Sequence, residues 1–362
     1  MQFAAYALCL DCAYIVPMSN SIVCPTLRVR LTAMFGLLAG ANLGAWLWAL
    51  LAFHDQPLLL GTALLAWSLG VRHAVDADHI AAIDNVTRKL MQERQRPVSV
   101  GFFFALGHSA VVALAAALLA TTATLLTGPL ARFKVIGGLI GTLVSALFLM
   151  AIAAVNTVTL AELWRAFQRA RRGHEGAPGE IVPQPGCGPL ARLLRPLFGL
   201  VTRAWHMLPL GFLFGLGFDT ATEVALLGLS ATQASAGLSL GSVMVFPALF
   251  AAGMSLVDSA NGALMLGAYD WALAQPMRKL FYNLVITLIS VVVAVFIAGI
   301  ELLALLGEEL HLSGRLWDAI GALSDNSSNL GFVIIGVFLA IWIGAAALWR
   351  YKQLDRLDTV GR

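Results

Sequence analysis

Charged side chains are scarce in this chain of 362 residues: they make up 12% of it, whereas hydrophobic residues make up 59%. Soluble domains contain about 25% charged and about 45–50% apolar residues, and their surfaces need the charge to remain in solution. The shortage therefore excludes a large soluble domain and indicates lipid as the solvent. The net charge of +3 gives no indication of a nucleic-acid partner.

Cysteine is also rare, with only four in the chain. Three of them lie in the first 24 residues and the fourth, Cys187, lies in a polar stretch. A disulfide framework is therefore not expected, and one C-x-x-C pair without a second is weak evidence for a metal site. Residues 1–30 lack a positive n-region and make a poor signal peptide, so we treat them as a poorly defined N-terminal segment.

Eight apolar segments approach the length of about 20 residues that crosses a bilayer. They are 33–53, 58–86, 98–126, 135–160, 206–230, 241–268, 281–306 and 330–350. The predicted fold is all-α, a polytopic membrane protein with about eight transmembrane helices. The polar stretch from Arg165 to Arg203 is expected to be a cytoplasmic loop without a domain of its own.

Lysine and arginine sort to one side of this arrangement. Nineteen lie before the first segment, in alternate loops or after the last segment, three lie in the other loops, and Arg72 lies within a span, which accounts for all 23. Short basic loops face the cytoplasm. Both termini are therefore predicted to be cytoplasmic.

The second segment carries ionisable and polar residues where lipid would surround it: Arg72, His73, Asp76, Asp78, His79, Asp84 and Asn85. Each ionisable group at mid-bilayer costs about 2.5–3.5 kcal/mol on insertion scales. One interpretation is a structural cluster of ion pairs that holds helices together, in which Arg72 neutralises an aspartate. Because two imidazoles and several carboxylates leave surplus negative charge and lone pairs, the composition favours an ion-binding site.

The spacing within this segment limits how it can bind an ion. At about 100° per residue, His73, His79 and Asp84 fall within an arc of about 140°, while Asp78 lies on the opposite side. A regular helix therefore cannot direct His73, Asp78 and His79 at one ion. We expect either a helix broken near Gly70, as is common where transport proteins bind substrate, or a supporting role for Asp78.

Polar residues recur in further spans: His108, Asn156, Asp219, Thr220, Thr222, Glu223, Ser255 and Asp258. Asp219 and Glu223 are four residues apart and share a helix face. Carboxylates in three separate spans are better explained by one shared polar pathway than by packing. His108 alone is either a core residue or a ligand, and Asn156 is either a pathway residue or an interhelical hydrogen bond.

A weak internal similarity accompanies these residues. Residues 104–112 resemble residues 250–258, and Gly70 and Gly217 each precede a charged motif. The two units, spans 2–4 and 5–7, would start three spans apart and so run in opposite directions. Inverted repeats with a site at their interface are typical of transporters.

Imidazole combined with carboxylate, without thiolate, suits a divalent ion such as Ni, Co, Zn, Fe or Cu(II). Sites for Mg²⁺ or Ca²⁺ are built from oxygen and need no histidine. Donor chemistry alone does not choose among the transition metals.

Four segments carry a family resemblance: 72–80 (RHAVDADHI), 104–112 (FALGHSAVV), 216–223 (LGFDTATE) and 246–258 (FPALFAAGMSLVD). The first resembles the H-x4-D-H signature of the nickel/cobalt transporter family, NiCoT, and the others resemble its later motifs in the same order. Similarity runs from about residue 33 to 350, and within the family it is nearest to the permeases of the hydrogenase-linked type. We therefore expect residues 31–362 to form a single transmembrane transporter domain.

The resemblance implies high-affinity uptake of Ni²⁺, with or without Co²⁺, across the bacterial inner membrane. It marks His73, Asp78 and His79 as essential, with Asp76 beside them, and the implied metal and pathway residues of later motifs are Asp219, Thr220, Thr222, Glu223, Ser255 and Asp258. The implied partners are the transported ion and the bilayer, with no cofactor. The oligomeric state is left open.

Two alternatives remain. Related exporters often carry a histidine-rich loop, but the large polar loop here has only His174, which favours uptake over efflux. An intramembrane metalloenzyme would hold zinc between His73 and His79, but the hydrolase motif H-E-x-x-H is absent from the sequence. The chain is therefore not expected to be an enzyme.

Overall fold

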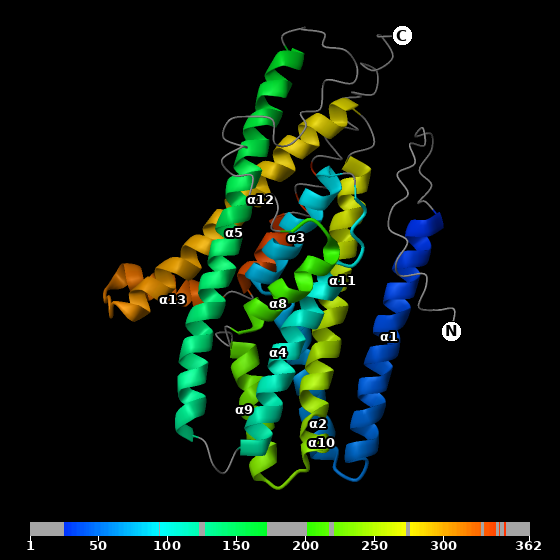
Figure 1. Ribbon diagram of the computed structural model, residues 1–362, viewed down its shortest axis with the longest axis vertical. Helices are drawn as coiled ribbons and strands as arrows, with labels where there is room; N and C mark the ends of the chain where they lie inside the picture. Colours follow the sequence, from blue (N-terminus) through cyan, green and yellow to red (C-terminus); the bar gives the residue numbers. More distant parts are fainter. Residues whose placement is uncertain are drawn as a thin grey trace.

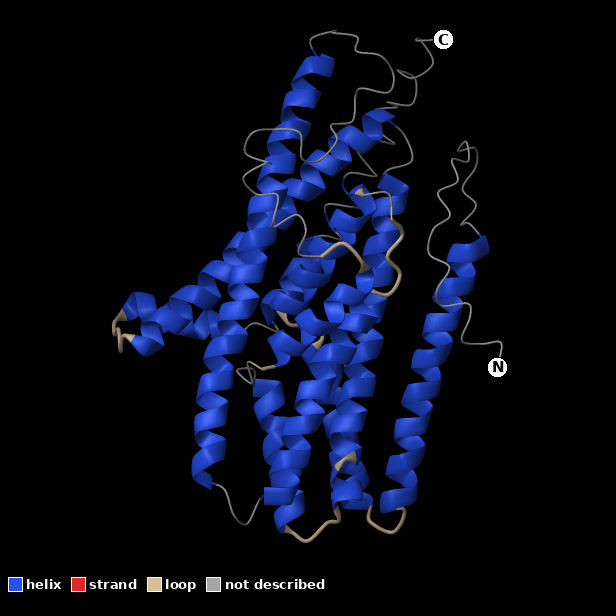
Figure 2. Cartoon of the chain, in the orientation of Figure 1, coloured by secondary structure: helices blue, strands red, loops and turns tan. Residues whose placement is uncertain are grey.

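The computed structural model describes residues 25–93, 95–122, 127–171, 201–216, 221–272, 276–326 and 329–337, with residues 340 and 344 beyond them. All regular elements in these ranges are helices, as the composition predicts. Figures 1 and 2 show a long helical bundle from which the end of α12 and the short α13 project to one side.

The helices begin and end as follows: α1 Pro25–Phe53, α2 Pro57–His73, α3 Ala77–Gln92, α4 Val100–Thr122, α5 Thr127–Arg171, η1 (a 3₁₀ helix) Ala204–His206, α8 Met207–Gly215, α9 Ala221–Ser235, α10 Leu240–Val243, α11 Val245–Ala272, α12 Pro276–Glu309 and α13 Arg315–Asp325. Proline opens α1, α2 and α12. Its fixed φ and missing N–H suit the first helical position, where no intrahelical donor is needed.

Within the described residues, five helical stretches are long and apolar enough to cross a membrane, and a sixth is the pair α2 and α3. The fifth predicted span, 206–230, is represented by α8 and α9, and residues 217–220 between them lie outside the described residues. The last predicted span is described only as the helical stretch 329–337 and single residues beyond it. The structure therefore supports a polytopic helical protein with five or six candidate spans in its described part.

Two predicted loop boundaries are wrong. The stretch after residue 86 is not yet a loop, because α3 continues to Gln92 and buries Arg88 and Lys89 to 2% and 5% exposure. The predicted loop from Arg165 likewise begins late, because α5 continues to Arg171. Residues 172–200 of that loop lie outside the described residues. Hydropathy fails here because burial inside a bundle, rather than contact with lipid, accommodates the charges.

The second predicted span is broken between α2 and α3, which meet at 51°. The amide of Asp76 donates to the carbonyl of His73, and Asp76 itself is extended, with ψ of 147°, as the N-cap of α3. The break therefore lies at residues 74–76 rather than at Gly70. An N-cap aspartate usually accepts from the first turn of its helix, but Asp76 makes no such bond, so its carboxylate is available for another partner.

Glycine brings α2 into close contact with α11 just before this break. A Cβ at Gly70 would overlap the carbonyl oxygen of Phe250, and a Cβ at Gly253 would lie 2.7 Å from the carbonyl oxygen of Trp67. Side chains at either position would force the helices apart. The close crossing fixes the end of α2, and with it His73, against α11.

A similar crossing joins α4 to α8. A Cβ at Gly107 would overlap the carbonyl oxygen of Leu208, and one at Gly211 would overlap that of Phe104. This contact places residue 108 next to the chain that leads into α9. The two glycine crossings thus hold four helices around one point.

We predict that Gly70→Ala destabilises the protein by about 1–3 kcal/mol, the usual cost of overpacking a close-packed interior. The matched control is Gly61→Ala in the same helix, because a Cβ at Gly61 meets nothing within 4 Å. Thermal unfolding in detergent measures both, and Gly61→Ala should be neutral or slightly stabilising. Equal melting temperatures for the two variants would contradict the close crossing.

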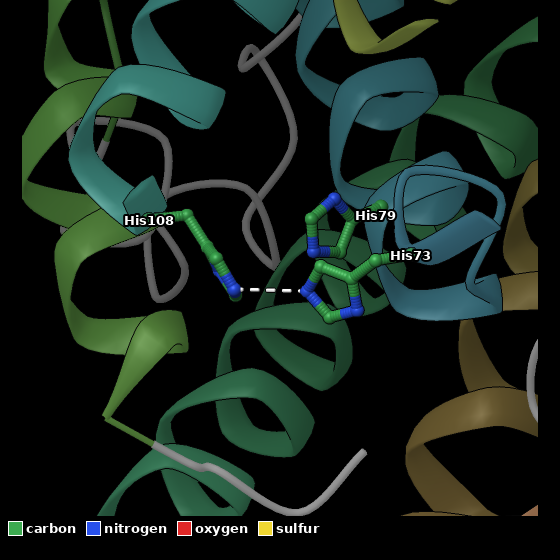
Figure 3. A group of neighbouring side chains, drawn as sticks. All are labelled: His73, His79 and His108. Atoms are coloured by element: carbon green, nitrogen blue, oxygen red, sulfur yellow. Dashed lines mark hydrogen bonds between the residues drawn. The ribbon is translucent and has the colours of Figure 1, made fainter. Parts of the chain in front are cut away.

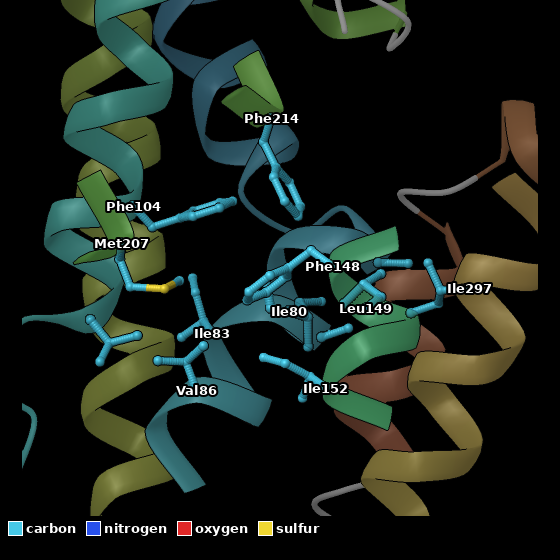
Figure 4. Packing of buried hydrophobic residues seen from close by; sticks show 14 of the residues in the cluster. Ile80, Ile83, Val86, Phe104, Phe148, Leu149, Ile152, Met207, Phe214 and Ile297 are labelled. Atoms are coloured by element: carbon cyan, nitrogen blue, oxygen red, sulfur yellow. The ribbon is translucent and has the colours of Figure 1, made fainter. Parts of the chain in front are cut away.

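Apolar residues of α3 pack into the largest described core cluster. Figure 4 shows Ile80, Ile83 and Val86 of α3 among aromatic and aliphatic side chains from α4, α5, α8 and α12. This core surrounds a helix whose remaining positions are largely polar. Helix α3 is therefore held at the centre of the bundle by one apolar face, which leaves its polar positions facing other helices rather than lipid.

Candidate metal site

Three histidines converge at the break between α2 and α3. His73 ends α2, His79 lies in the first turns of α3, and His108 lies midway along α4. Their ring centroids are separated by 4.6, 4.8 and 4.9 Å, and one nitrogen of each ring lies within 4.8 Å of the others. Figure 3 shows the three rings pointing toward one another from two sides. Their exposure is 1%, 0% and 3%.

Carboxylates hold two of the three rings by their Nδ1 atoms. Asp76 Oδ2 lies 3.0 Å from Nδ1 of His73, and Asp258 Oδ2, from α11, lies 3.3 Å from Nδ1 of His79. Both carboxylates are fully buried. A ring that donates Nδ1–H to a carboxylate presents an unprotonated Nε2, which is the usual arrangement of a metal-binding histidine.

The third ring faces the carboxylate of α9. Nε2 of His108 lies 2.8 Å from Oε1 of Glu223 and 2.9 Å from Nε2 of His73. Thr222 adds a hydroxyl 3.1 Å from Nδ1 of His73. Nε2 atoms of two histidines and a carboxylate oxygen therefore share one small volume in which a cation would be stabilised.

Some ring nitrogens in this cluster have no protein partner. Among the described residues, Nε2 of His79 and Nδ1 of His108 make no hydrogen bond although both are buried. Burying a polar atom without a partner costs about 1–3 kcal/mol. The lone pair of His79 Nε2 is thus the donor that an ion would satisfy.

Aromatic rings enclose the cluster. Phe104 contacts His79 edge-on at 4.8 Å between centroids, and Phe250 lies 5.4 Å from His73. Both phenylalanines are fully buried, and their backbones form the two glycine crossings. The three histidines are therefore buried among aromatic side chains and closely packed helix backbones.

Other predicted site residues lie around this cluster or apart from it. Arg72 is exposed, so it does not neutralise an aspartate inside the cluster. Asp78 lies in the first turn of α3 and is half-buried, where the helix N-terminus favours a carboxylate. Ser255 is half-buried on α11. Asp219 and Thr220 lie outside the described residues.

Asp84, Asn85 and Asn156 are buried but are not gathered at the histidines. Asp84 accepts a hydrogen bond from Ser290 of α12, and Asn85 accepts one from Asn156 of α5. The prediction that one helix face joins Asp84 to His73 and His79 is wrong, because the break at residues 74–76 separates His73 from α3. On α3 itself Asp84 lies about 140° from His79 and faces another helix. Asn156 makes the interhelical hydrogen bond that was its alternative interpretation.

Several residues that shape this region could not be recognised from the sequence. Ser290 and Thr287 are single hydroxyl residues in the apolar run of α12, and such residues are common in membrane helices. Phe104 and Phe250 belong to the internal repeat and to the family motifs, but neither pattern predicts that their rings enclose the histidines. His108 was recognised as a candidate, and the glycine before it, which permits the close crossing, was the available signal for its position.

Fold and site together define a multi-pass membrane protein with a buried histidine and carboxylate centre suited to a divalent metal ion. Residues 59–348 match the family described as NicO, high-affinity nickel-transport protein, and the chain belongs to this family. This membership confirms the resemblance seen in the four motifs, and the family is one of transport proteins rather than enzymes.

Individual relatives cover most of the chain. It is 54% identical over 329 residues to the high-affinity nickel transport protein of Cupriavidus necator, covering 91% of this chain and 94% of that protein. It is 55% identical over 318 residues to the hydrogenase nickel incorporation protein HupN of Bradyrhizobium diazoefficiens, covering 88% and 83%. The cobalt transport protein NhlF of Rhodococcus rhodochrous is 41% identical over 329 residues, covering 88% and 92%. No solved structure matches the chain.

Proposed function

We propose that this protein takes up Ni²⁺, and Co²⁺ to some degree, across the bacterial inner membrane, and that the ion binds between His73, His79 and His108. The observation that carries the proposal is the convergence of three buried imidazoles at a helix break. Membership of a nickel-transport family supports the choice of ion. The relative named for cobalt supports the second ion.

The donor set suits such an ion. Imidazole nitrogens combined with a carboxylate oxygen suit borderline divalent ions such as Ni²⁺, Co²⁺ and Zn²⁺. The hydrogen bond of 2.9 Å between Nε2 of His73 and Nε2 of His108 shows that two of these donors meet at one point. The choice of nickel among these ions is supported by the family and not by the donor set.

Glu223 is proposed as an oxygen ligand, and Asp76 and Asp258 as the groups that orient His73 and His79. Three ionised carboxylates around a divalent ion leave a net charge of −1, which favours cations over neutral species. Asp78 and Asp219 remain proposed contributors from the family motif, with Thr220, Thr222 and Ser255 along the path. Their part in binding is a proposal that rests on the motifs.

For the topology we propose eight spans in one domain over residues 31–362, with both termini in the cytoplasm. Most of the basic segments adjoin helix termini that lie together at one end of the bundle in Figure 1. Cysteine labelling tests this arrangement. Gln95→Cys, between α3 and α4, should react only from the cytoplasm, and Ala236→Cys, at an exposed position between α9 and α10, only from outside. Labelling of both from one side would contradict the topology.

We also propose that spans 2–4 and 5–7 form an inverted repeat, and the glycine crossings support it. Phe104 precedes Phe250 by 146 positions, and Gly107 precedes Gly253 by the same number. The residues that they contact are related in the same way. Trp67 precedes Leu208 by 141 positions, and Gly70 precedes Gly211 by the same number. The crossing of α2 with α11 is thus repeated by α8 with α4, which favours Gly211 rather than Gly217 as the counterpart of Gly70.

The repeat suggests how the ion could be released. The three imidazoles belong to the first unit, whereas the carboxylates of Glu223 and Asp258 belong to the second. Movement of one unit against the other would separate imidazoles from carboxylates and lower the affinity on the side that opens. The membrane potential can drive such uptake: two charges crossing 100 mV yield about 4.6 kcal/mol, or about three decades of concentration.

Uptake of ⁶³Ni²⁺ by proteoliposomes containing the purified protein tests the proposed function. With an inside-negative potential, we expect accumulation that excess Ni²⁺ abolishes, that Co²⁺ reduces and that Mg²⁺ leaves unchanged. Vesicles that bind the ion but accumulate none, or that only release it, would contradict uptake.

A further inference from the structure

A second buried polar group lies behind the metal site, and no step of the proposed uptake uses it. We call it the α3–α5–α12 polar cluster, and it consists of Asp84, Asn85, Arg88, Asn156, Thr287 and Ser290. Each of these side chains is exposed by 2% or less. An ionisable group costs about 2.5–3.5 kcal/mol at mid-membrane, so this cluster needs an explanation of its own.

The cluster faces away from the histidines. At about 100° per residue, Asp84 lies about 140° and Arg88 about 180° around α3 from His79. The side of α3 nearer to His79 carries the apolar Ile83 and Val86, which Figure 4 shows packed in the core. Helix α3 therefore has two separate polar faces, and only one of them contacts the proposed metal ligands.

Hydrogen bonds connect the cluster across three helices. Ser290 Oγ donates to Asp84 Oδ2 at 2.7 Å, and Arg88 donates to Thr287 Oγ1 at 3.1 Å and to Asn85 Oδ1 at 3.2 Å. Asn156 donates to the same Asn85 oxygen at 2.7 Å. Except for Asp84 and Arg88, every member is neutral, so the cluster holds one carboxyl group and one fixed cation.

The hydroxyl of Ser290, which contacts Asp84, suits both protonation states of a carboxyl group. A serine hydroxyl can donate to a carboxylate, as it does here, and can turn to accept from a carboxylic acid. A proton could therefore bind and leave without breaking this contact. Purely structural pinning of helices would be served equally well by an amide at this position.

The charged surroundings of Asp84 are simple within the described residues. On α3 the nearest fixed charge is Arg88, four residues on, with Lys89 beside it and Asp78 about two turns before. The facing stretch 145–159 of α5 and the stretch 329–337 contain no titratable residue. The facing stretch 287–301 of α12 contains only Glu301, half-buried, eleven residues from Ser290 and on the same face. In the proposed topology, the carboxyl group of Glu301 therefore lies on the outer side of Asp84, and the guanidinium of Arg88 lies on its cytoplasmic side.

We propose that Asp84 is a proton-binding residue that couples a proton flux to metal uptake, a step that rests on the proposed transport function. The Asp84 carboxylate takes a proton while the cluster is open to the outer side and releases it to the cytoplasm, returning to its ionised form once per cycle. Because α3 carries both polar faces, a movement of this helix changes the access of the ion and of the proton together. The coupled proton passes along the face of α3 that carries Asp84, which the metal ion does not contact.

The test compares wild-type protein, Asp84→Asn and Asp84→Glu in proteoliposomes whose potential is clamped at zero by valinomycin and equal K⁺. A gradient of one pH unit, acid outside, is worth about a factor of ten in metal accumulation per coupled proton. We expect this gain for wild type and Asp84→Glu and its loss in Asp84→Asn. A pH dye inside the vesicles should report proton entry on Ni²⁺ addition in the first two proteins only.

Asp84→Asn should retain its affinity for Ni²⁺ in detergent within about twofold, because the three histidines are untouched. It should also retain uptake driven by an inside-negative potential at equal pH, which separates this inference from the proposed function. Asn156→Ala, which removes a hydrogen bond but no titratable group, should keep the response to the pH gradient. A gradient response in Asp84→Asn equal to that of wild type, or no response in wild type, would overturn the proposal. Should Asp84→Asn fail to fold, the dye signal of wild type and Asp84→Glu decides.

Discussion

Replacing His108 with glutamine is expected to lower the affinity for Ni²⁺ by more than about a hundredfold, beyond the 10–100-fold that removal of an orienting partner usually costs. His108 supplies Nε2 at 2.9 Å from that of His73 and 2.8 Å from Glu223. Without this ring the ion loses a ligand, and the carboxylate of Glu223 loses one hydrogen-bond partner. Glutamine is polar and of similar length, so it limits the loss of packing.

Isothermal titration with Ni²⁺ in detergent measures this effect, and ⁶³Ni²⁺ uptake should fall in parallel. The matched control is His54→Gln, because His54 is an exposed histidine whose side chain is 71% accessible and which pairs only with Asp55 beside it. That variant should bind as wild type does. If His108→Gln retained affinity within about threefold while folding normally, His108 would be a core residue and the three-histidine site would be wrong.

Glu223→Gln is expected to have the second largest effect. The substitution preserves size and a carbonyl oxygen but removes one of three negative charges in a fully buried volume, where charge interactions are screened far less than in water. Asp258→Asn should cost less, about 10–100-fold, because Asp258 orients His79 without being placed to contact the ion. The expected order of affinity is wild type, then Asp258→Asn, then Glu223→Gln.

The same titration, with Glu308→Gln as an exposed control, tests this order. Circular dichroism and thermal unfolding check that each variant keeps its fold. An affinity for Glu223→Gln as high as that of wild type would remove Glu223 from the ligands. A larger loss in Asp258→Asn than in Glu223→Gln would exchange their proposed roles.

Much of the site could be predicted from the sequence because charge in an apolar chain is conspicuous. His73, Asp76, His79, Glu223 and Asp258 all stood out as ionisable groups in spans, and the structure gathers them in one place. The conflict over Asp78 on a regular helix predicted either a break in that span or a supporting role for Asp78, and the structure shows a break. The break itself falls a few residues later than expected, because the extended residue that precedes α3 is Asp76 and not a glycine.

Other features could not be predicted, for physical reasons. A helical wheel assumes one continuous helix, so the 51° break invalidated the angle assigned between His73 and the residues of α3. Hydropathy treats Arg88 and Lys89 as loop residues, whereas they are buried in the bundle. Long-range pairs such as Asp84 with Ser290, separated by 206 positions, depend on tertiary packing that no local pattern specifies.

The most direct test of the central claim, that three imidazoles hold the transported ion, is X-ray absorption at the nickel edge on the Ni²⁺-loaded protein. The account predicts a shell of nitrogen and oxygen ligands at about 2.0–2.1 Å with the multiple scattering of three imidazole rings, reduced to two in His108→Gln. A shell of oxygen ligands alone, or a ring count that His108→Gln leaves unchanged, would contradict it.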